Sequence, residues 1–189
     1  MKKFLVVGNP IDHSLSPALH NYWIKSNAID AIYEKQKLNE DELEQLILQV
    51  KEKKINGVNV TVPFKKVIIP FLDELSIEAE STQSVNTIYL KDDKVVGHNT
   101  DIIGFETSIE KSKFNVFNKE VLILGAGGVV PSIIFALNKM KVSKIKISNR
   151  TKEKAENLKK LFKNIEIIEW GEVPNFDVII NATSLGLKK

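Results

Sequence analysis

VLILGAGG, residues Val121–Gly128, is an apolar run that leads directly into a glycine-rich turn. A helical pattern follows over 128–140, so the three pieces predict a strand at 121–125, a turn and a helix. Glycines in this setting let backbone amides approach a pyrophosphate at the start of the helix. Val130 stands where the GxGxxG pattern has its third glycine, so a merely tight turn between strand and helix is an open alternative.

The pattern around this stretch repeats toward the C-terminus. Strands are predicted at 144–148, 165–168 and 177–181, and a helix at 152–163 with a solvated, lysine-rich face. Strands alternating with helices predict a parallel sheet with right-handed crossovers. A complete doubly wound dinucleotide fold has six strands. We therefore expect a partial Rossmann-like domain over 105–189 that is truncated at its C-terminus.

The end of the strand at 144–148 indicates which dinucleotide is bound. Proteins that bind NAD place an acid there to hold the ribose 2′-hydroxyl, but this chain has Asn149, Arg150 and Thr151. Asn149 as a turn residue and Thr151 as a helix cap are structural alternatives. Arg150 lies beside a helix start, where a cation is unfavourable unless an anion joins it. A 2′-phosphate is such an anion, so NADP is the predicted cofactor.

A second informative stretch is NVTVPFK, Asn59–Lys65, which follows Val58. A strand over 58–62 places three valines (58, 60 and 62) on one face and Asn59 and Thr61 on the other. Pro63 ends the ladder and leaves Lys65 at the mouth of the strand, where open α/β sheets bind ligands.

The rest of the first half also alternates. Strands are predicted at 4–7, 31–36, 84–90 and 94–98, and helices at 16–26, 39–54, 65–72, 76–82 and 100–113. In the helix at 39–54, Glu42 holds the capping-box position and an apolar face repeats at helical spacing through Leu43, Leu46, Ile47 and Val50. We expect an α/β protein of two domains. The first, 1–104, binds substrate and has a mainly parallel sheet.

Hydroxyl and amide groups lie at several predicted element ends. Ser16 precedes Pro17 and is placed to be an N-cap, whereas Ser14 has no such structural explanation. The two hydroxyls at a positive helix end are equally able to receive a carboxylate. Thr100 or Asn99 caps the next helix, with Asp101 in its first turn, and Asn86 is a polar residue between apolar neighbours in a strand.

Composition excludes several classes of function. The 27 basic and 24 acidic residues give a net charge of +3 without a basic block, which argues against nucleic acid binding. There is no cysteine, and the three histidines lack ligand spacing with acids, so no metal is predicted. No apolar run approaches the roughly 20 residues of a membrane span. We expect a cytoplasmic protein, monomeric or homodimeric, without a membrane partner.

Taken together, these motifs resemble the shikimate dehydrogenase family, and their order matches along the whole chain. The matching stretches are Ser14–Pro17 with His20 and Asn21, Asn59–Lys65, Val85–Thr87, Asn99–Asp101 with Gly104, Gly125–Gly128, Asn149–Thr151 and Asn181–Gly186. Gln83-Ser84 before Val85, and Val129–Pro131 after the glycine turn, depart from the usual pattern.

The resemblance implies reversible reduction of 3-dehydroshikimate to shikimate with NADPH, in the route to chorismate and the aromatic amino acids. The implied substrate ligands are Ser14 and Ser16 for the carboxylate, and Thr61, Lys65, Asn86 and Asp101 for the hydroxyl and keto groups. The implied cofactor ligands are Gly125, Ala126, Gly127 and Gly128 at the pyrophosphate, Asn149, Arg150 and Thr151 at the 2′-phosphate, and Asn181, Ala182 and Thr183.

Oxidation of a carbinol couples hydride loss to loss of the hydroxyl proton, which a positioned acid–base group must handle. Lys65 and Asp101 are the predicted catalytic residues. Whether Lys65 transfers the proton or only polarises the oxygen is left open at this stage. Two alternatives to the function are a quinate/shikimate dehydrogenase and a shikimate-binding module without turnover.

Overall fold

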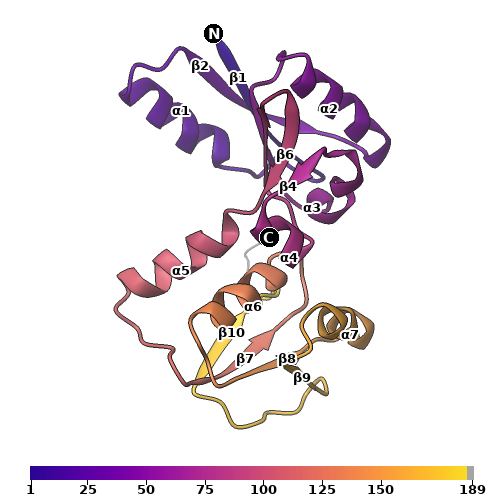
Figure 1. Ribbon diagram of the computed structural model, residues 1–189. Helices are drawn as coiled ribbons and strands as arrows, with labels where there is room; N and C mark the ends of the chain where they lie inside the picture. Colours follow the sequence, from indigo (N-terminus) through magenta and orange to yellow (C-terminus); the bar gives the residue numbers. More distant parts are fainter. Residues whose placement is uncertain (187–189) are drawn as a thin grey trace. The chain divides into compact units, whose positions relative to one another are not determined.

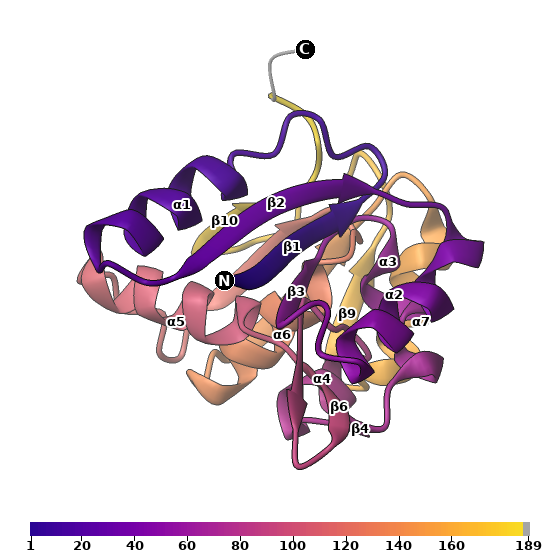
Figure 2. The same ribbon diagram turned by 90° about the horizontal axis from the view of Figure 1, so that it is seen from above.

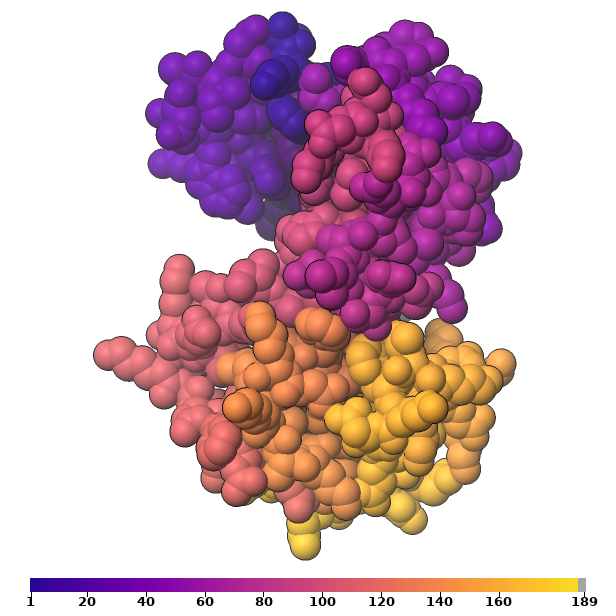
Figure 3. Space-filling model, viewed as in Figure 1, coloured from indigo at the N-terminus to yellow at the C-terminus, as the bar shows by residue number. Residues whose placement is uncertain are grey.

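The computed structural model describes residues 1–186. The chain divides after Thr100 into two compact units, Met1–Thr100 and the residues from Asp101 onward. Figure 3 draws unit 1 from indigo to magenta and unit 2 from pink to yellow. The domain change expected at 104/105 falls inside helix α5 (Asp101–Lys111), which opens unit 2. Both units are α/β, as predicted.

Unit 1 is built on a six-stranded sheet in the order β2-β1-β3-β5-β6-β4. Its strands are β1 (Lys2–Gly8), β2 (Ala31–Lys37), β3 (Gly57–Val60), β4 (Glu74–Leu75), β5 (Thr87–Lys91) and β6 (Lys94–His98). β1 pairs in parallel with β2 and β3, and β4 with β6, whereas β5 runs antiparallel to both neighbours. Figure 2 shows β1 and β2 side by side with the same direction. The prediction of a mainly parallel sheet is confirmed; the short β4 was not predicted.

The helices of unit 1 are α1 (Ser16–Ser26), α2 (Leu43–Lys51), α3 (Phe64–Val67) and α4 (Ile77–Thr82), with short 3-10 turns at Glu40–Glu42 and Ile69–Phe71 (Figure 1). The predicted apolar face of α2 is fully buried in the unit 1 core. The Asn39 N–H donates to the Glu42 carboxylate at 2.7 Å, as the capping box predicts. α2 ends at Lys51, before the expected Lys54.

β3 stops two residues before the predicted end of its strand. Val58 and Val60 are buried, but Val62 is 58% exposed, so the predicted strand face of three valines does not extend beyond Val60. The reason is local. The Thr61 N–H donates to the Val7 carbonyl and the Val62 carbonyl accepts from the Asn9 N–H, so the chain still follows β1 past the end of β3; α3 then begins directly after Pro63.

Unit 2 has a four-stranded, all-parallel sheet in the order β10-β7-β8-β9, as the alternating pattern predicts. Its strands are β7 (Glu120–Leu124), β8 (Lys144–Ser148), β9 (Ile165–Ile168) and β10 (Val178–Asn181), and its further helices are α6 (Val130–Lys139) and α7 (Lys152–Leu161). Val130, at the third glycine position, is fully buried in the unit 2 core. Since all four strands are parallel, their carboxyl ends meet at one edge, where ligands bind in such sheets.

Within residues 1–186 there is no helix with both the length and the apolar character that a bilayer crossing demands.

Candidate functional site

The glycine turn after β7 is shaped by one crowded glycine and two open ones. Gly125 has φ +109°, and a Cβ there would lie 2.8 Å from the Ala182 carbonyl oxygen, so only glycine fits. The Ala182 N–H donates to the Leu124 carbonyl at 2.8 Å, which fixes the end of β10 against the turn. A Cβ on Gly128 would meet nothing within 4 Å, and one on Gly127 only the Ala182 oxygen at 3.9 Å. A side chain at Gly127 or Gly128 would therefore meet no close contact, which leaves room beside both residues for a ligand such as a phosphate.

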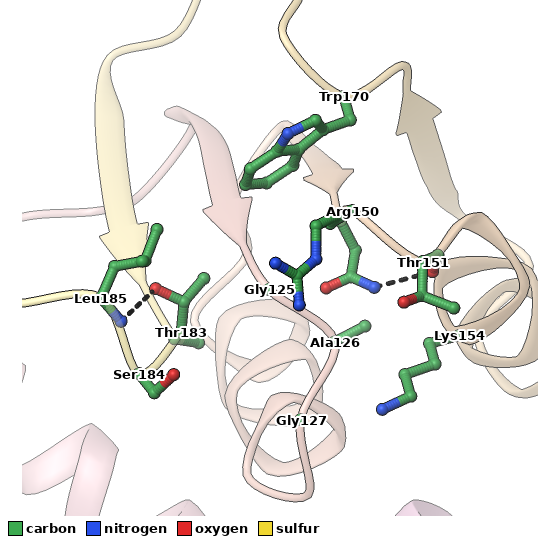
Figure 4. Close-up of a pocket in the computed structure, with 12 residues that line it drawn as sticks. Gly125, Ala126, Gly127, Arg150, Thr151, Lys154, Trp170, Thr183, Ser184 and Leu185 are labelled. Atoms are coloured by element: carbon green, nitrogen blue, oxygen red, sulfur yellow. Dashed lines mark hydrogen bonds between the residues drawn. The ribbon is translucent and has the colours of Figure 1, made fainter.

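A cavity of about 290 Å³ lies at the carboxyl ends of the unit 2 strands (Figure 4). We call it the nucleotide cavity. Its lining is Gly125, Ala126, Gly127, Asn149, Arg150, Thr151, Lys154, Trp170, Ala182, Thr183, Ser184 and Leu185. The structure thus brings together most residues expected at the cofactor. Gly128 and Asn181 are not in the lining. Lys154, Trp170, Ser184 and Leu185 line it without having been predicted.

Two cations in this cavity have no acidic partner. Arg150 and Lys154 are exposed, and neither forms an ion pair within residues 1–186. Lys152, between them in the chain, pairs with Glu169 instead. Lys154 lies in the first turn of α7, where the helix dipole also disfavours a cation. Lys154, which was predicted to lie on a solvated helix face, is therefore a cation at a helix start in need of an anion, as Arg150 is.

The loop before α7 is closed by Asn149, whose Nδ2 donates to the Thr151 carbonyl at 2.7 Å. This agrees with the alternative of Asn149 as a turn residue. Thr151 is the residue before the helix, but its side chain makes no capping bond, so its role as a side-chain cap is not met.

Asn181 organises the segment after β10. Its Oδ1 accepts hydrogen bonds from the Thr183 N–H at 3.0 Å and the Thr183 hydroxyl at 2.7 Å, and its Nδ2 donates to the Leu185 carbonyl. Asn181 therefore holds the loop that carries Thr183 into the nucleotide cavity.

What we call the amide network in unit 1 is formed by the side chains of Asn59 on β3, Asn86 just before β5, Thr87 at the start of β5 and Thr100 after β6. Asn86 Oδ1 accepts hydrogen bonds from the Thr100 N–H at 2.9 Å and from the hydroxyls of Thr100 and Thr87. Asn59 Nδ2 donates to the Asn86 carbonyl and to Thr87 Oγ1, both at 3.2 Å. Asn86 is 9% exposed, so these contacts satisfy an amide that water reaches poorly.

Tyr33 on β2 contacts the amide network through Asn59. Its hydroxyl donates to Asn59 Oδ1 at 2.6 Å, and burial raises its pKa to about 12. The ring of His20 stacks on Tyr33 with centroids 4.1 Å apart, and burial lowers the pKa of His20. The side chain of Asn21 bonds both the N–H and the carbonyl of Tyr33. Sequence analysis missed Tyr33, although the period of two had placed its partner Asn59 on the polar face.

The serine pair at the start of α1 has roles opposite to those expected. Ser16 is the first helical residue and makes no capping bond, so its prediction as N-cap is wrong. Ser14 instead accepts a hydrogen bond from the Ser16 N–H at 3.3 Å. Nearby, Gly8 packs tightly under Thr61, since a Cβ on Gly8 would lie 2.6 Å from Thr61 Cγ2.

Lys65 and Thr100 are bonded to the neighbouring residues Val85 and Asn86. Lys65, half-buried in α3, accepts a backbone hydrogen bond from Val85 at 2.8 Å. Thr100 is held by Asn86, and Asp101 is the next residue. Within residues 1–186 there is no cluster of three His, Asp or Glu side chains arranged to hold a metal ion.

The chain is similar to shikimate dehydrogenases along its length. One sequence-family model, the shikimate dehydrogenase substrate binding domain, matches residues 6–88, and a second, shikimate / quinate 5-dehydrogenase, matches residues 108–186. Shikimate dehydrogenase (NADP(+)) of Pelagibacter ubique is 64% identical over 188 residues, which is 100% of this chain and 71% of that protein.

Solved structures agree. The crystal structure of shikimate dehydrogenase from Aquifex aeolicus superposes with a TM-score of 0.90 at 39% identity, covering 100% of this chain and 71% of that one. Shikimate 5-dehydrogenase from Thermus thermophilus, solved with NADP(H) and shikimate, has a TM-score of 0.89 at 30% identity, covering 99% and 70%.

Proposed function

Because the chain belongs to the shikimate dehydrogenase family, we propose that the residues described above carry out its reaction, the NADP-dependent interconversion of 3-dehydroshikimate and shikimate. The observation that carries this is the nucleotide cavity, where an open glycine turn meets Arg150 and Lys154, two cations without an acidic partner in residues 1–186. A dianionic 2′-phosphate and a pyrophosphate supply the anions that such a site lacks.

The residues present fit NADP. The glycine turn, residues 125–128, would hold the pyrophosphate. Arg150, Thr151 and Lys154 would hold the 2′-phosphate, and Thr183 the middle of the dinucleotide. Bound there, the cofactor supplies the hydride exchange. Charge-assisted hydrogen bonds from Arg150 and Lys154 favour NADP over NAD, because NAD leaves both cations without a partner.

Hydride transfer is coupled to transfer of the proton of the reacting hydroxyl. We assign Lys65 to that proton: as an ammonium it donates to the developing alkoxide, and as an amine it accepts the hydroxyl proton. Asp101 is its proposed partner at the same hydroxyl. In unit 1 the Lys65 carbonyl accepts a backbone bond from Val85, and Asn86 bonds Thr100, the residue before Asp101.

We assign neutral side chains to the carboxylate and the hydroxyls of the substrate. Ser14 and Ser16 at the start of α1 would take the carboxylate, aided by the positive end of the helix. Thr61 and Asn86 would orient the ring hydroxyls. Since Asn86 Oδ1 already accepts from Thr87 and Thr100, its part is to orient rather than to move a proton.

Quinate is a second candidate substrate, because the model that matches residues 108–186 is named for both shikimate and quinate. Quinate is saturated and carries one more hydroxyl than shikimate. A pocket without a group dedicated to that hydroxyl discriminates poorly against it. Cytoplasmic location and a monomeric or homodimeric state remain predictions of the sequence.

The experiment is an initial-rate assay of NADPH formation by the 189-residue protein with NADP⁺ and either shikimate or quinate. We expect turnover with shikimate and a lower kcat/KM with quinate. Turnover with quinate alone would reassign the substrate. Shikimate binding by calorimetry without turnover would make the chain a binding module instead.

A further inference from the structure

Trp170 is an aromatic side chain that lines the nucleotide cavity. It follows β9, is 48% exposed, and is the one aromatic residue among the described lining residues. Figure 4 shows its indole extending over the cavity above Arg150. A half-exposed tryptophan that lines a cavity has a large flat apolar face available to a ligand.

The loop that carries Trp170 is fixed to both sides of Arg150. The carbonyl of Glu169 accepts a hydrogen bond from the Ser148 hydroxyl at 3.3 Å, and its carboxylate pairs with Lys152. Ser148 and Lys152 flank the segment Asn149–Thr151 in the chain. The residue next to Trp170 is therefore tied to the last residue of β8 and the first residue of α7. This places the indole beside Arg150 before any ligand arrives.

Further contacts keep the loop in shape. The Glu172 N–H donates to the Glu169 carbonyl at 3.1 Å, and Gly171 between them has φ +98°, which a glycine adopts at little cost. Lys146, 6% exposed, donates from Nζ to the Asn175 carbonyl at 2.6 Å and also pairs with Glu120. The loop is thus anchored to β8 at both of its ends. A loop that is already ordered costs less conformational entropy when a ligand binds.

We propose that Trp170 is the stacking surface for the adenine of NADP, so that the cofactor is held by its base at Trp170 and by its 2′-phosphate at Arg150 and Lys154. This inference rests on the proposed NADP function. The base is attached to the ribose carbon next to the one that carries the 2′-phosphate. A nucleotide whose phosphate reaches Arg150 therefore has its base within reach of the neighbouring indole. Stacking on an aromatic side chain accounts for a roughly tenfold or larger part of base affinity.

Adenosine 2′,5′-bisphosphate is the probe, because it has the adenine and the 2′-phosphate but no nicotinamide. The chain has two tryptophans, Trp23 and Trp170, so Trp23→Phe leaves Trp170 as the sole indole and is the matched control. In Trp23→Phe we expect the probe to quench tryptophan emission, with the parent Kd from calorimetry. In Trp170→Leu we expect Kd to rise about tenfold or more with an unchanged Tm, and Trp170→Phe to restore most of the affinity.

The outcomes distinguish adenine stacking on Trp170 from NADP binding by the cavity as a whole. If Trp170→Leu binds the bisphosphate as the parent does, or if Trp170 emission does not respond, the stacking role is wrong while the NADP site stands. If the parent itself binds neither the bisphosphate nor NADP⁺, the proposed cofactor function fails, and the inference fails with it.

Discussion

The amide network of unit 1 and the nucleotide cavity of unit 2 prepare for ligands in opposite ways. In the network, Asn59 and Asn86 already have their hydrogen bonds to Tyr33, Thr87 and Thr100. In the cavity, Arg150 and Lys154 are exposed without an acidic partner in residues 1–186. A poorly hydrated amide must be satisfied within the fold, whereas an exposed cation keeps its water until an anion replaces it. The comparison predicts that unit 1 orients its substrate with neutral side chains, whereas unit 2 binds the phosphates of the cofactor with cations.

The largest effect is expected where the network meets the chemistry. Lys65→Met should lower kcat by about 10²- to 10⁴-fold with little change in KM, because proton transfer belongs to the transition state. The measurement is steady-state oxidation of shikimate with NADP⁺. Lys66→Met, a substitution of the neighbouring exposed lysine, is the matched control and should retain kcat. An unchanged kcat in Lys65→Met would remove this residue from the mechanism.

Substitutions in the glycine turn test how strictly the backbone of the nucleotide cavity is constrained. Gly125→Ala should lower the free energy of unfolding by about 3 kcal/mol, because it combines a positive φ with a Cβ 2.8 Å from the Ala182 oxygen. Gly128→Ala, where a Cβ meets nothing within 4 Å, should change it by less than about 1 kcal/mol. Denaturant titration of both variants measures the difference. Equal stabilities would show that the turn is not held against β10.

Removal of one cation tests whether the nucleotide cavity of unit 2 binds the phosphates of the cofactor. Arg150→Gln should raise the Kd for NADP⁺ by about 10- to 100-fold and leave that for NAD⁺ nearly unchanged, because only NADP⁺ carries the 2′-phosphate. Calorimetry gives both constants. Lys152→Gln removes a nearby cation that is already paired with Glu169 and serves as the control. Equal weakening of the two nucleotides would place Arg150 away from the 2′-phosphate.

The smallest effect should come from the support of the network. Tyr33→Phe leaves Asn59 Oδ1 without the hydroxyl donor and should cost about 1 kcal/mol of stability. Since burial raises the folded pKa of Tyr33 from 10.0 to about 12, the unfolded chain loses its phenolic proton first. The parent therefore loses stability as pH rises from 10 to 12. Tyr33→Phe should lack that loss.

Tyr22→Phe alters an exposed tyrosine and should retain the alkaline loss of the parent. Denaturation midpoints measured across this pH range give the result. A parallel pH dependence in Tyr33→Phe and the parent would mean that the buried phenol is not the group that titrates.

Periodicity predicted the parts of the fold that depend on local pattern. The apolar face of α2 and the parallel strands of unit 2 are as expected, because a repeat of 3.6 or 2 residues fixes which side chains are buried. The exposure of Val62 and the exchange of roles between Ser14 and Ser16 were not predictable, because each depends on where the chain leaves a regular element.

Motifs predicted most of the nucleotide cavity but not its outer wall. The glycine turn and Arg150 stand in a recognisable sequence context. Trp170 follows β9 in a loop whose position is set by contacts of Glu169 with Ser148 and Lys152, which are distant in sequence. Tyr33 was missed for the same reason, because its partner Asn59 is on another strand. Side chains that meet only through tertiary structure leave no local signal.

Initial rates of NADPH formation, measured while shikimate and NADP⁺ are each varied, test the division of labour between the two units most directly. The double variant Ser14→Ala and Ser16→Ala should raise the KM for shikimate and leave that for NADP⁺ unchanged, and Arg150→Gln should do the reverse. If either variant raised the KM of the wrong reactant alone, or if the parent did not oxidise shikimate, the account would be contradicted.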